Sequence, residues 1–272
     1  MELVYFDIIP PEIIELIVYR LNNEDLESMK SLINLDLNWS RVYTYRFGIY
    51  KNVDYQGYFQ WISIEKLKEM MNLKGSIEEL FNAKDLYLSY NELTSIPREI
   101  GNLQSLQELG LHYNQLISIP KEIGNLQSLQ YLSLYKNKLT SIPREIGDLK
   151  SLQELHLSDN QLTSIPKEIG NLQSLKELYL SDNQLTSIPK EIGNLQSLQR
   201  LYLYNNQLTT IPREIGELQS LQYLSLYNNQ LTSVPKEIGN LPSLQYLNLD
   251  NNQLVLIPEE IINNKNIKIN FN

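Results

Sequence analysis

The chain has 272 residues, with 32 acidic against 23 basic side chains and no cysteine. The acidic balance, without a basic run, argues against binding to nucleic acid through its phosphates. The lack of cysteine excludes disulfides and thiol chemistry, and no apolar stretch approaches the roughly 20 residues that cross a bilayer. We therefore expect neither a nucleic-acid nor a membrane partner.

Residues 1–47 show the periodicity of helices. Pro11 suits a first helical turn, where its missing N–H is harmless. One apolar helix face follows, formed by Ile13, Ile14, Ile17, Val18 and Leu21. Further helical runs are predicted from Leu26 to Ile33 and around Trp39. The first residues lack the basic region and apolar core of a signal peptide, so we expect a cytoplasmic chain.

The same segment carries a recognisable spacing: Ile9-Pro10, Glu12-Ile13-Ile14, Ile17, Leu21 and Asp25-Leu26, with Trp39 as a looser match. It resembles an F-box, a three-helix module that docks onto the Skp-family adaptor of cullin–RING ubiquitin ligases. The resemblance implies an adaptor contact through Pro10, Ile13, Ile14, Ile17 and Leu26. Two departures from the family pattern are Asn23, where a proline is usual, and the late position of Trp39. The alternative is a helical cap that only shields the first leucine layer behind it.

Residues 48–82 are expected to form a connector and an N-terminal cap. Ser63 is placed to begin a helix that stops at Gly75. The apolar residues of that helix are Ile64, Leu67, Met70 and Met71. Ser76 followed by Glu79 has the spacing of a capping box ahead of a second helical turn.

Asparagine then recurs every 23 residues, at Asn91, Asn114, Asn137, Asn160, Asn183, Asn206, Asn229 and Asn252. The unit around each reads L-x-x-L-x-L-x-x-N-x-L-x-x-I-P-x-x-I-G-x-L. It resembles the leucine-rich repeat over residues 83–262, in eight units. We expect an α/β fold, a leucine-rich-repeat solenoid with a curved parallel sheet and end caps, preceded by the small all-α domain.

The chemistry of the unit supports this architecture. Leu155 and Leu157 alternate with the polar His156, as in a strand with one buried face. The amide of Asn160 is expected to satisfy backbone groups where the chain leaves the strand. Pro166 marks the end of the strand, and Gly170 suits a left-handed or tightly packed backbone position. In residues 263–272 the apolar alternation from Ile267 to Phe271 predicts a short closing strand.

The differences between repeats concentrate at strand positions that face the concave side. Eleven of the 18 tyrosines lie there: Tyr87, Tyr90, Tyr113, Tyr131, Tyr135, Tyr179, Tyr202, Tyr204, Tyr223, Tyr227 and Tyr246. Tyrosine offers the large, rigid, amphipathic contact that interfaces favour. The alternative is that these tyrosines are only surface compatible with a sheet.

Two zones are predicted on this face. The acidic zone contains Glu154, Asp159, Glu177 and Asp182. The tyrosine zone contains Tyr202, Tyr204, Tyr223, Tyr227 and Tyr246, with Arg200 at its border, and Tyr131, Tyr135 and Tyr179 complete the predicted binding residues. We expect a protein ligand to set a basic element against the acidic zone and apolar or aromatic groups against the tyrosines.

Little in the sequence suggests catalysis. His112 and His156 lie two repeats apart, roughly 10 Å at normal strand spacing, and so do not share a metal. Each Gly-Asn-Leu belongs to the repeat and is not a phosphate loop. Glu154 and Glu177 could resemble the paired carboxylates of an acid–base site, but we expect them to lie on an open face with no closing pocket. We expect no enzyme activity, no metal site and no cofactor.

Two functions remain as hypotheses. The first is a substrate adaptor that recruits a protein ligand through the concave face to a cullin–RING ubiquitin ligase. The alternative is a general leucine-rich-repeat binding scaffold with no such link. The abundance of Asn, Ile, Lys and Tyr, together with the layout, resembles repeat proteins of large DNA viruses, which implies a host cytoplasm and host ubiquitin machinery.

Overall fold

The computed structural model of the protein describes residues 64, 67, 68 and 71–271. These residues belong to one compact unit, Ser63–Asn272. The predicted helices of residues 1–47, and the F-box-like positions with them, lie outside the described residues. In the described part of the chain, no helix is long and apolar enough to cross a membrane.

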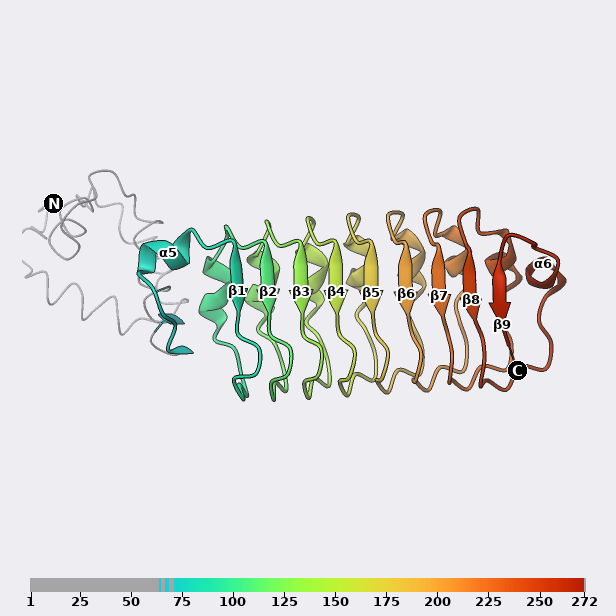
Figure 1. Ribbon diagram of the computed structural model, residues 1–272, viewed down its shortest axis with the longest axis horizontal. Helices are drawn as coiled ribbons and strands as arrows, with labels where there is room; N and C mark the ends of the chain where they lie inside the picture. The colour runs from blue at the N-terminus through green and yellow to red at the C-terminus, as the bar shows by residue number, and fades with distance from the viewer. Residues whose placement is uncertain (1–63, 65–66, 69–70, 272) are drawn as a thin grey trace, which may run out of the picture. The chain divides into compact units, whose positions relative to one another are not determined.

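Nine short strands form one sheet in which every neighbouring pair is parallel and chain order is kept from end to end (Figure 1). Their bounds are β1 (Asp85–Tyr87), β2 (Glu108–Gly110), β3 (Tyr131–Ser133), β4 (Glu154–His156), β5 (Glu177–Tyr179), β6 (Arg200–Tyr202), β7 (Tyr223–Ser225), β8 (Tyr246–Asn248) and β9 (Lys268–Asn270). From β1 to β8 the paired residues are 23 apart, as Leu155 with Leu178. The repeat length therefore sets the sheet register, and the predicted solenoid is confirmed.

The outer side of the solenoid is built from single turns of 3-10 helix. Their bounds are η2 (Arg98–Asn102), η3 (Lys121–Asn125), η4 (Arg144–Asp148), η5 (Lys167–Asn171), η6 (Lys190–Asn194), η7 (Arg213–Glu217) and η8 (Lys236–Asn240). Each follows the proline of its repeat, which holds an extended backbone, as at Pro166 with φ −68° and ψ 147°. Of the two roles predicted for Gly170, a left-handed or a tightly packed position, the structure shows the second. A Cβ at Gly170 would lie 2.3 Å from the Glu191 carbonyl oxygen.

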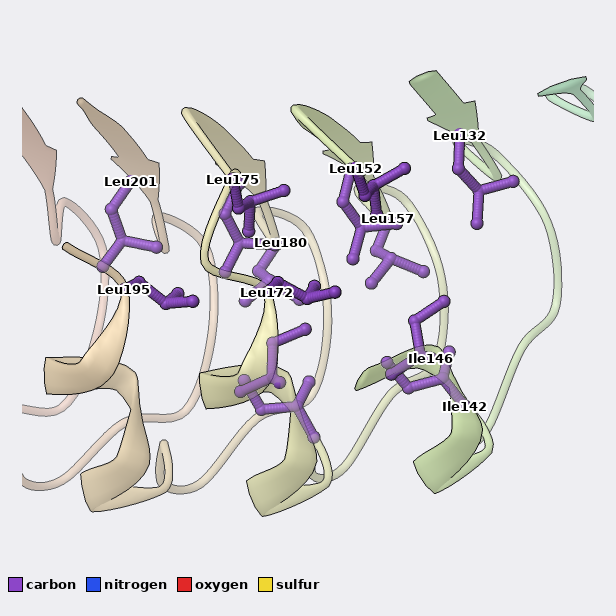
Figure 2. Packing of buried hydrophobic residues seen from close by; sticks show 14 of the residues in the cluster. Leu132, Ile142, Ile146, Leu152, Leu157, Leu172, Leu175, Leu180, Leu195 and Leu201 are labelled. Atoms are coloured by element: carbon purple, nitrogen blue, oxygen red, sulfur yellow. The ribbon is translucent and has the colours of Figure 1, made fainter. Parts of the chain in front are cut away.

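The core runs through the repeats as stacked layers of leucine and isoleucine (Figure 2). The strand leucines, the leucine after each asparagine and the isoleucine of the outer turn all point inward between the sheet and the outer turns. In the fifth layer, Leu178, Leu180, Leu185 and Ile192 expose no surface. Because each layer covers its neighbours, burial depends on stacking and not on any single repeat.

The repeated asparagine forms the polar part of the same frame. Asn160 Nδ2 donates to the carbonyl oxygens of Leu134, Leu157 and Ser158 at 3.0, 3.0 and 3.2 Å. Its Oδ1 accepts from the Leu139 N–H at 3.0 Å. One side chain thereby satisfies backbone groups of two successive repeats where the chain turns off the sheet. This is the role predicted for Asn160.

The two ends of the solenoid differ. At the start, helix α5 (Ile77–Phe81) begins with the predicted capping box between Ser76 and Glu79. Ile64 and Leu67, which precede this helix in the sequence, are fully buried. At the other end the chain forms helix α6 (Glu259–Ile262) and then β9, which pairs with β8 where the closing strand was predicted.

Candidate protein-binding face

We define the strand face as the side chains at the first and third strand positions and at the third and fourth residues after the middle strand leucine. In β4 and its turn these are Glu154, His156, Ser158 and Asp159. Alternation along each strand sends the middle leucine inward and the first and third side chains outward. Of the two residues that follow, Ser158 is largely buried and Asp159 lies in the turn with a φ of 54°. The face is therefore one surface, assembled from equivalent positions of successive repeats.

Six aromatic rings form a continuous row across β3 to β8. The centroid separations are 5.0 Å for Tyr131–His156, 4.2 Å for His156–Tyr179, 4.6 Å for Tyr179–Tyr202, 5.0 Å for Tyr202–Tyr223 and 4.6 Å for Tyr223–Tyr246. Three of the five pairs are stacked within 28° of parallel. We call this the aromatic row. It crosses the repeats of both the acidic zone and the tyrosine zone, which were predicted as separate regions.

Stacking decides what the aromatic row offers to a ligand. The inner rings cover one another's faces, so ring edges and hydroxyl groups remain for contact. Burial raises the pKa of Tyr202 and of Tyr223 above the ordinary value of 10.0. Burial, reinforced by a hydrogen bond to Glu177, also raises the pKa of Tyr179. These three tyrosines therefore stay uncharged at neutral pH, and their hydroxyl groups can donate and accept hydrogen bonds next to apolar ring edges.

Glu177 links the two predicted zones through direct contacts. It accepts a hydrogen bond from the Tyr179 hydroxyl and forms an ion pair with Arg200. The Glu177 side chain is only 17% exposed, while Arg200 is 46% exposed. Glu154, which is paired with Glu177 in the sheet register, is 43% exposed and contacts His156 at 3.4 Å. The predicted closeness of the acidic residues is found, but part of their charge is balanced by Arg200.

A ladder of side-chain hydrogen bonds runs along the turns that follow the strands. Asn205 donates to Asp182 at 2.6 Å, and Asn228 donates to Asn205 at 2.8 Å. Asn251 donates in turn to Asn228. All four residues have φ of 54° or 55°, a region in which asparagine and aspartate are favoured over other side chains. The predicted site residue Asp182 is thus the acidic end of an amide ladder, which the sequence reasoning missed.

The first repeats carry a smaller aromatic group. Tyr90 stacks on Tyr113 at 4.5 Å, and Tyr113 meets Tyr135 edge to face at 5.4 Å. The Lys136 ammonium lies 4.9 Å from the Tyr113 ring centroid. The predicted residues Tyr204 and Tyr227 occupy the same position of their repeats as Tyr135, and Tyr227 is 39% exposed. Neither takes part in the aromatic row.

The two histidines have separate surroundings. His112 Nδ1 lies 2.9 Å from the Ser89 hydroxyl, and His156 is part of the aromatic row. Among the described residues, no cluster of three or more His, Asp and Glu side chains is arranged to hold a metal ion. The geometry of the strand face is that of a broad contact surface.

Comparison with known families agrees with this architecture. Residues 62–156 and 119–221 match a family model described as a leucine-rich repeat region, and residues 196–254 match a second leucine-rich-repeat model. The first of these models spans more than half of the chain. The chain is a leucine-rich-repeat protein. Proteins of this family are typical scaffolds for contacts with other proteins. No curated protein matches the chain.

Several solved structures are similar to this leucine-rich-repeat chain. The ectodomain of the plant membrane receptor kinase GASSHO1/SCHENGEN3 from Arabidopsis thaliana, in complex with CASPARIAN STRIP INTEGRITY FACTOR 2, is 42% identical over 64% of this chain and 22% of its own, with a TM-score of 0.60. A TDR receptor is 26% identical over 70% and 39%, with a TM-score of 0.61. A leucine-rich-repeat protein of Leptospira interrogans is 42% identical over 72% and 62%, with a TM-score of 0.47. The chain thus spans less than two thirds of each of these structures.

Proposed function

We propose that this chain is a non-catalytic interaction module that holds a protein segment against its strand face. The observation that carries the proposal is the aromatic row, which crosses six strands without a break. Such a row presents large, rigid side chains whose order is already fixed, so little entropy is lost when a ligand binds. A similar ectodomain, that of the plant receptor kinase, is known in complex with a factor, which supports the same use here.

The charges on the face suggest the chemistry of the segment. Glu154 contacts His156 of the aromatic row, and Asp159 lies in the turn of the same repeat, where its charge interacts with Lys136. Neither carboxylate forms a salt bridge with an Arg or Lys among the described residues. Arg200 already neutralises Glu177. A Lys or Arg of the ligand is therefore expected to meet Glu154 and Asp159, while its apolar or aromatic groups pack along the rings from Tyr202 to Tyr246. Complementary charge would fix the direction of the segment and speed its association.

Selection of linear peptides from a random display library tests this function without knowledge of the natural ligand. The purified full chain is the bait, and the selected peptides are then tested against variants. Changing Tyr202 and Tyr223 to serine should weaken binding at least tenfold. A matched pair on the outer turns, Lys190→Ala with Lys236→Ala, should leave affinity unchanged. Peptides that bind both variants equally well would overturn the proposal, and so would peptides selected without any Lys or Arg.

The link to ubiquitin ligases is a second proposal and rests on the N-terminal sequence pattern. Pro10, Ile13, Ile14, Ile17 and Leu26 would form an apolar contact with a Skp-family adaptor, and the strand face would hold the substrate. A pull-down with purified adaptor tests it. The parent chain should bind, Ile13→Asp with Ile17→Asp should not, and the Tyr202/Tyr223 serine variant should bind like the parent. Failure of the parent chain to bind any Skp-family adaptor would sink this link and leave the peptide-binding proposal intact.

The same proposal places the chain in the cytoplasm, or in a host cytoplasm if its origin is viral. The cysteine-free composition fits a reducing compartment. Fractionation of cells that express the full chain, with soluble and secreted marker proteins alongside, tests this placement. Recovery in the secreted fraction would contradict it.

A further inference from the structure

The C-terminal end of the solenoid exposes an apolar surface. Val255 is 90% exposed, Leu256 74%, Ile262 53% and Phe271 51%. We call these four residues the end patch. The terminal unit of a repeat protein normally shows a polar outer surface to water, so four large exposed apolar side chains at this end form a candidate contact surface.

Comparison within the chain shows that the end patch is specific to the last repeat. The position of Leu256 is held in the seven earlier repeats by Ser95, Ser118, Ser141, Ser164, Ser187, Thr210 and Ser233. The position of Val255 is threonine in six of them and isoleucine only at Ile117. Ile262 replaces the glycine of every earlier outer turn, as at Gly239. The Thr-Ser pair of this position has become two aliphatic residues only in the last repeat, and Ile262 stands exposed where the outer-turn glycines up to Gly239 are packed against the next repeat.

The end patch also has a shape that can receive a side chain. A cleft of about 250 Å³ lies there, and its lining includes Leu249, Leu254, Ile257 and Phe271. Leu256 is part of the same lining and is largely exposed. A projecting leucine beside an apolar cleft is complementary to itself, because Leu256 of each of two copies can enter the cleft of the other. An interface with a two-fold axis has this reciprocal form.

The charges at this end favour a second copy as the partner. The chain as a whole carries a net charge of −9, which opposes self-association. The last repeat nevertheless carries both signs of charge. Glu259 and Glu260 belong to α6 on the outer side, Lys268 begins β9 on the strand side, and Lys265 lies between these two elements. All four side chains are exposed. A two-fold axis parallel to the strands sets the outer side of one copy beside the strand side of the other. Glu259 and Glu260 would then face Lys268 of the second copy.

We propose that two copies of this chain associate end to end through the end patch. The interface buries Val255, Leu256, Ile262 and Phe271 of both copies and covers the open edge of the sheet, since β9 has a strand neighbour only on the β8 side. With the axis parallel to the strands, the two strand faces point to opposite sides. One dimer can then hold two ligand segments, and two binding modules on one body raise avidity without any new contact.

Sedimentation equilibrium of the full chain over a wide concentration range tests this dimer. The parent chain should approach twice the mass of a single chain. Val255→Thr with Leu256→Ser restores the pair found in other repeats and should weaken association at least tenfold, equivalent to about 1.4 kcal/mol. The matched control is Ile117→Thr, which removes the other exposed aliphatic residue at the same repeat position and should leave the dimer unchanged. Thermal unfolding of all three chains should coincide at concentrations where they are monomeric.

Three outcomes would overturn the proposal. The parent chain could remain a monomer at the highest soluble concentration, which would mean that no second copy covers the end patch. It could dimerise equally well in the Val255/Leu256 variant, which would place the interface elsewhere in the chain. It could also grow beyond two copies, which a closed two-fold interface does not allow.

Discussion

Each repeat combines a buried frame with an exposed strand face, and the copies agree in the first far more than in the second. The frame consists of the leucine layers, the asparagine and the outer turn, and it repeats almost without change from Leu106 to Leu241. On the strand face, the equivalent positions hold residues as different as Glu177, Arg200 and Tyr223. The frame is constrained because each copy must fit its neighbours. The face is free to vary because its side chains meet neighbours only at the surface.

The sharpest test of this contrast is the removal of one frame asparagine. Asn183 is 8% exposed and holds the carbonyl oxygens of Leu157, Leu180 and Ser181 as well as the Leu162 N–H. Asn183→Ala should lower the free energy of unfolding by about 1–3 kcal/mol for each of these groups that stays buried and unpaired. Urea unfolding followed by circular dichroism measures the loss.

The matched control lies on the face. Asn205→Gly removes the amide from the part-buried ladder and keeps a residue that tolerates the φ of 54° at this position. It should cost less than half as much as Asn183→Ala. Equal losses would show that the ladder at the turn belongs to the frame.

The second test removes volume from one leucine layer. Leu178→Ala opens a cavity in a fully buried layer and should cost about 2–5 kcal/mol of unfolding free energy. Leu254→Ala makes the same truncation at the partly buried end of the solenoid and should cost less, since the site can relax into solvent. Chemical denaturation of both variants measures the difference, and a larger loss at Leu254 would contradict the picture of uniform internal layers.

The sequence predicted the frame well because its period is also the register of the sheet. A strand residue and the residue 23 positions later lie on neighbouring strands from β1 to β8, so Leu155 pairs with Leu178. Asn160 and Asn183 occupy equivalent positions of neighbouring repeats. Most members of the face were identified by the same rule. The pairing of Glu177 with Arg200 and Tyr179 was not, because it depends on side-chain rotamers that the period does not fix.

The aromatic row shows the same limit. Tyr131 and Tyr223 stand at the first strand position, whereas His156, Tyr179 and Tyr202 stand at the third. The row changes column twice, so a search within one column finds only parts of it. His156 is the direct partner of Tyr179 in one column, but a grouping of tyrosines alone leaves it out. A search of diagonal neighbours on adjacent strands, which long side chains can reach, would have found the row.

The third test measures how much the aromatic row stabilises the face. Tyr202 lies between Tyr179 and Tyr223, and Tyr202→Leu should cost about 1 kcal/mol from the lost ring contacts. Tyr227→Leu, at an exposed position outside the row, should change stability by less than about 0.5 kcal/mol. A double-mutant cycle with Tyr179→Leu isolates the ring pair. A coupling energy of zero would show that the rings are neighbours without mutual stabilisation.

The smallest effect concerns proton binding by His156. Burial lowers the pKa of His156 below its ordinary value of 6.5, although the hydrogen bond and charge of Glu154 oppose the shift. The unfolded chain therefore takes up this proton at a higher pH than the folded chain does. The contribution of His156 to stability is fully present above pH 6.5 and is lost as the pH falls through the folded-state pKa.

His156→Phe keeps a ring between Tyr131 and Tyr179 but does not titrate. The unfolding free energy of the variant minus that of the parent should be constant above pH 6.5 and should rise below it. A difference that stays constant, or falls, on acidification would mean that the Glu154 carboxylate outweighs burial at this position in the row.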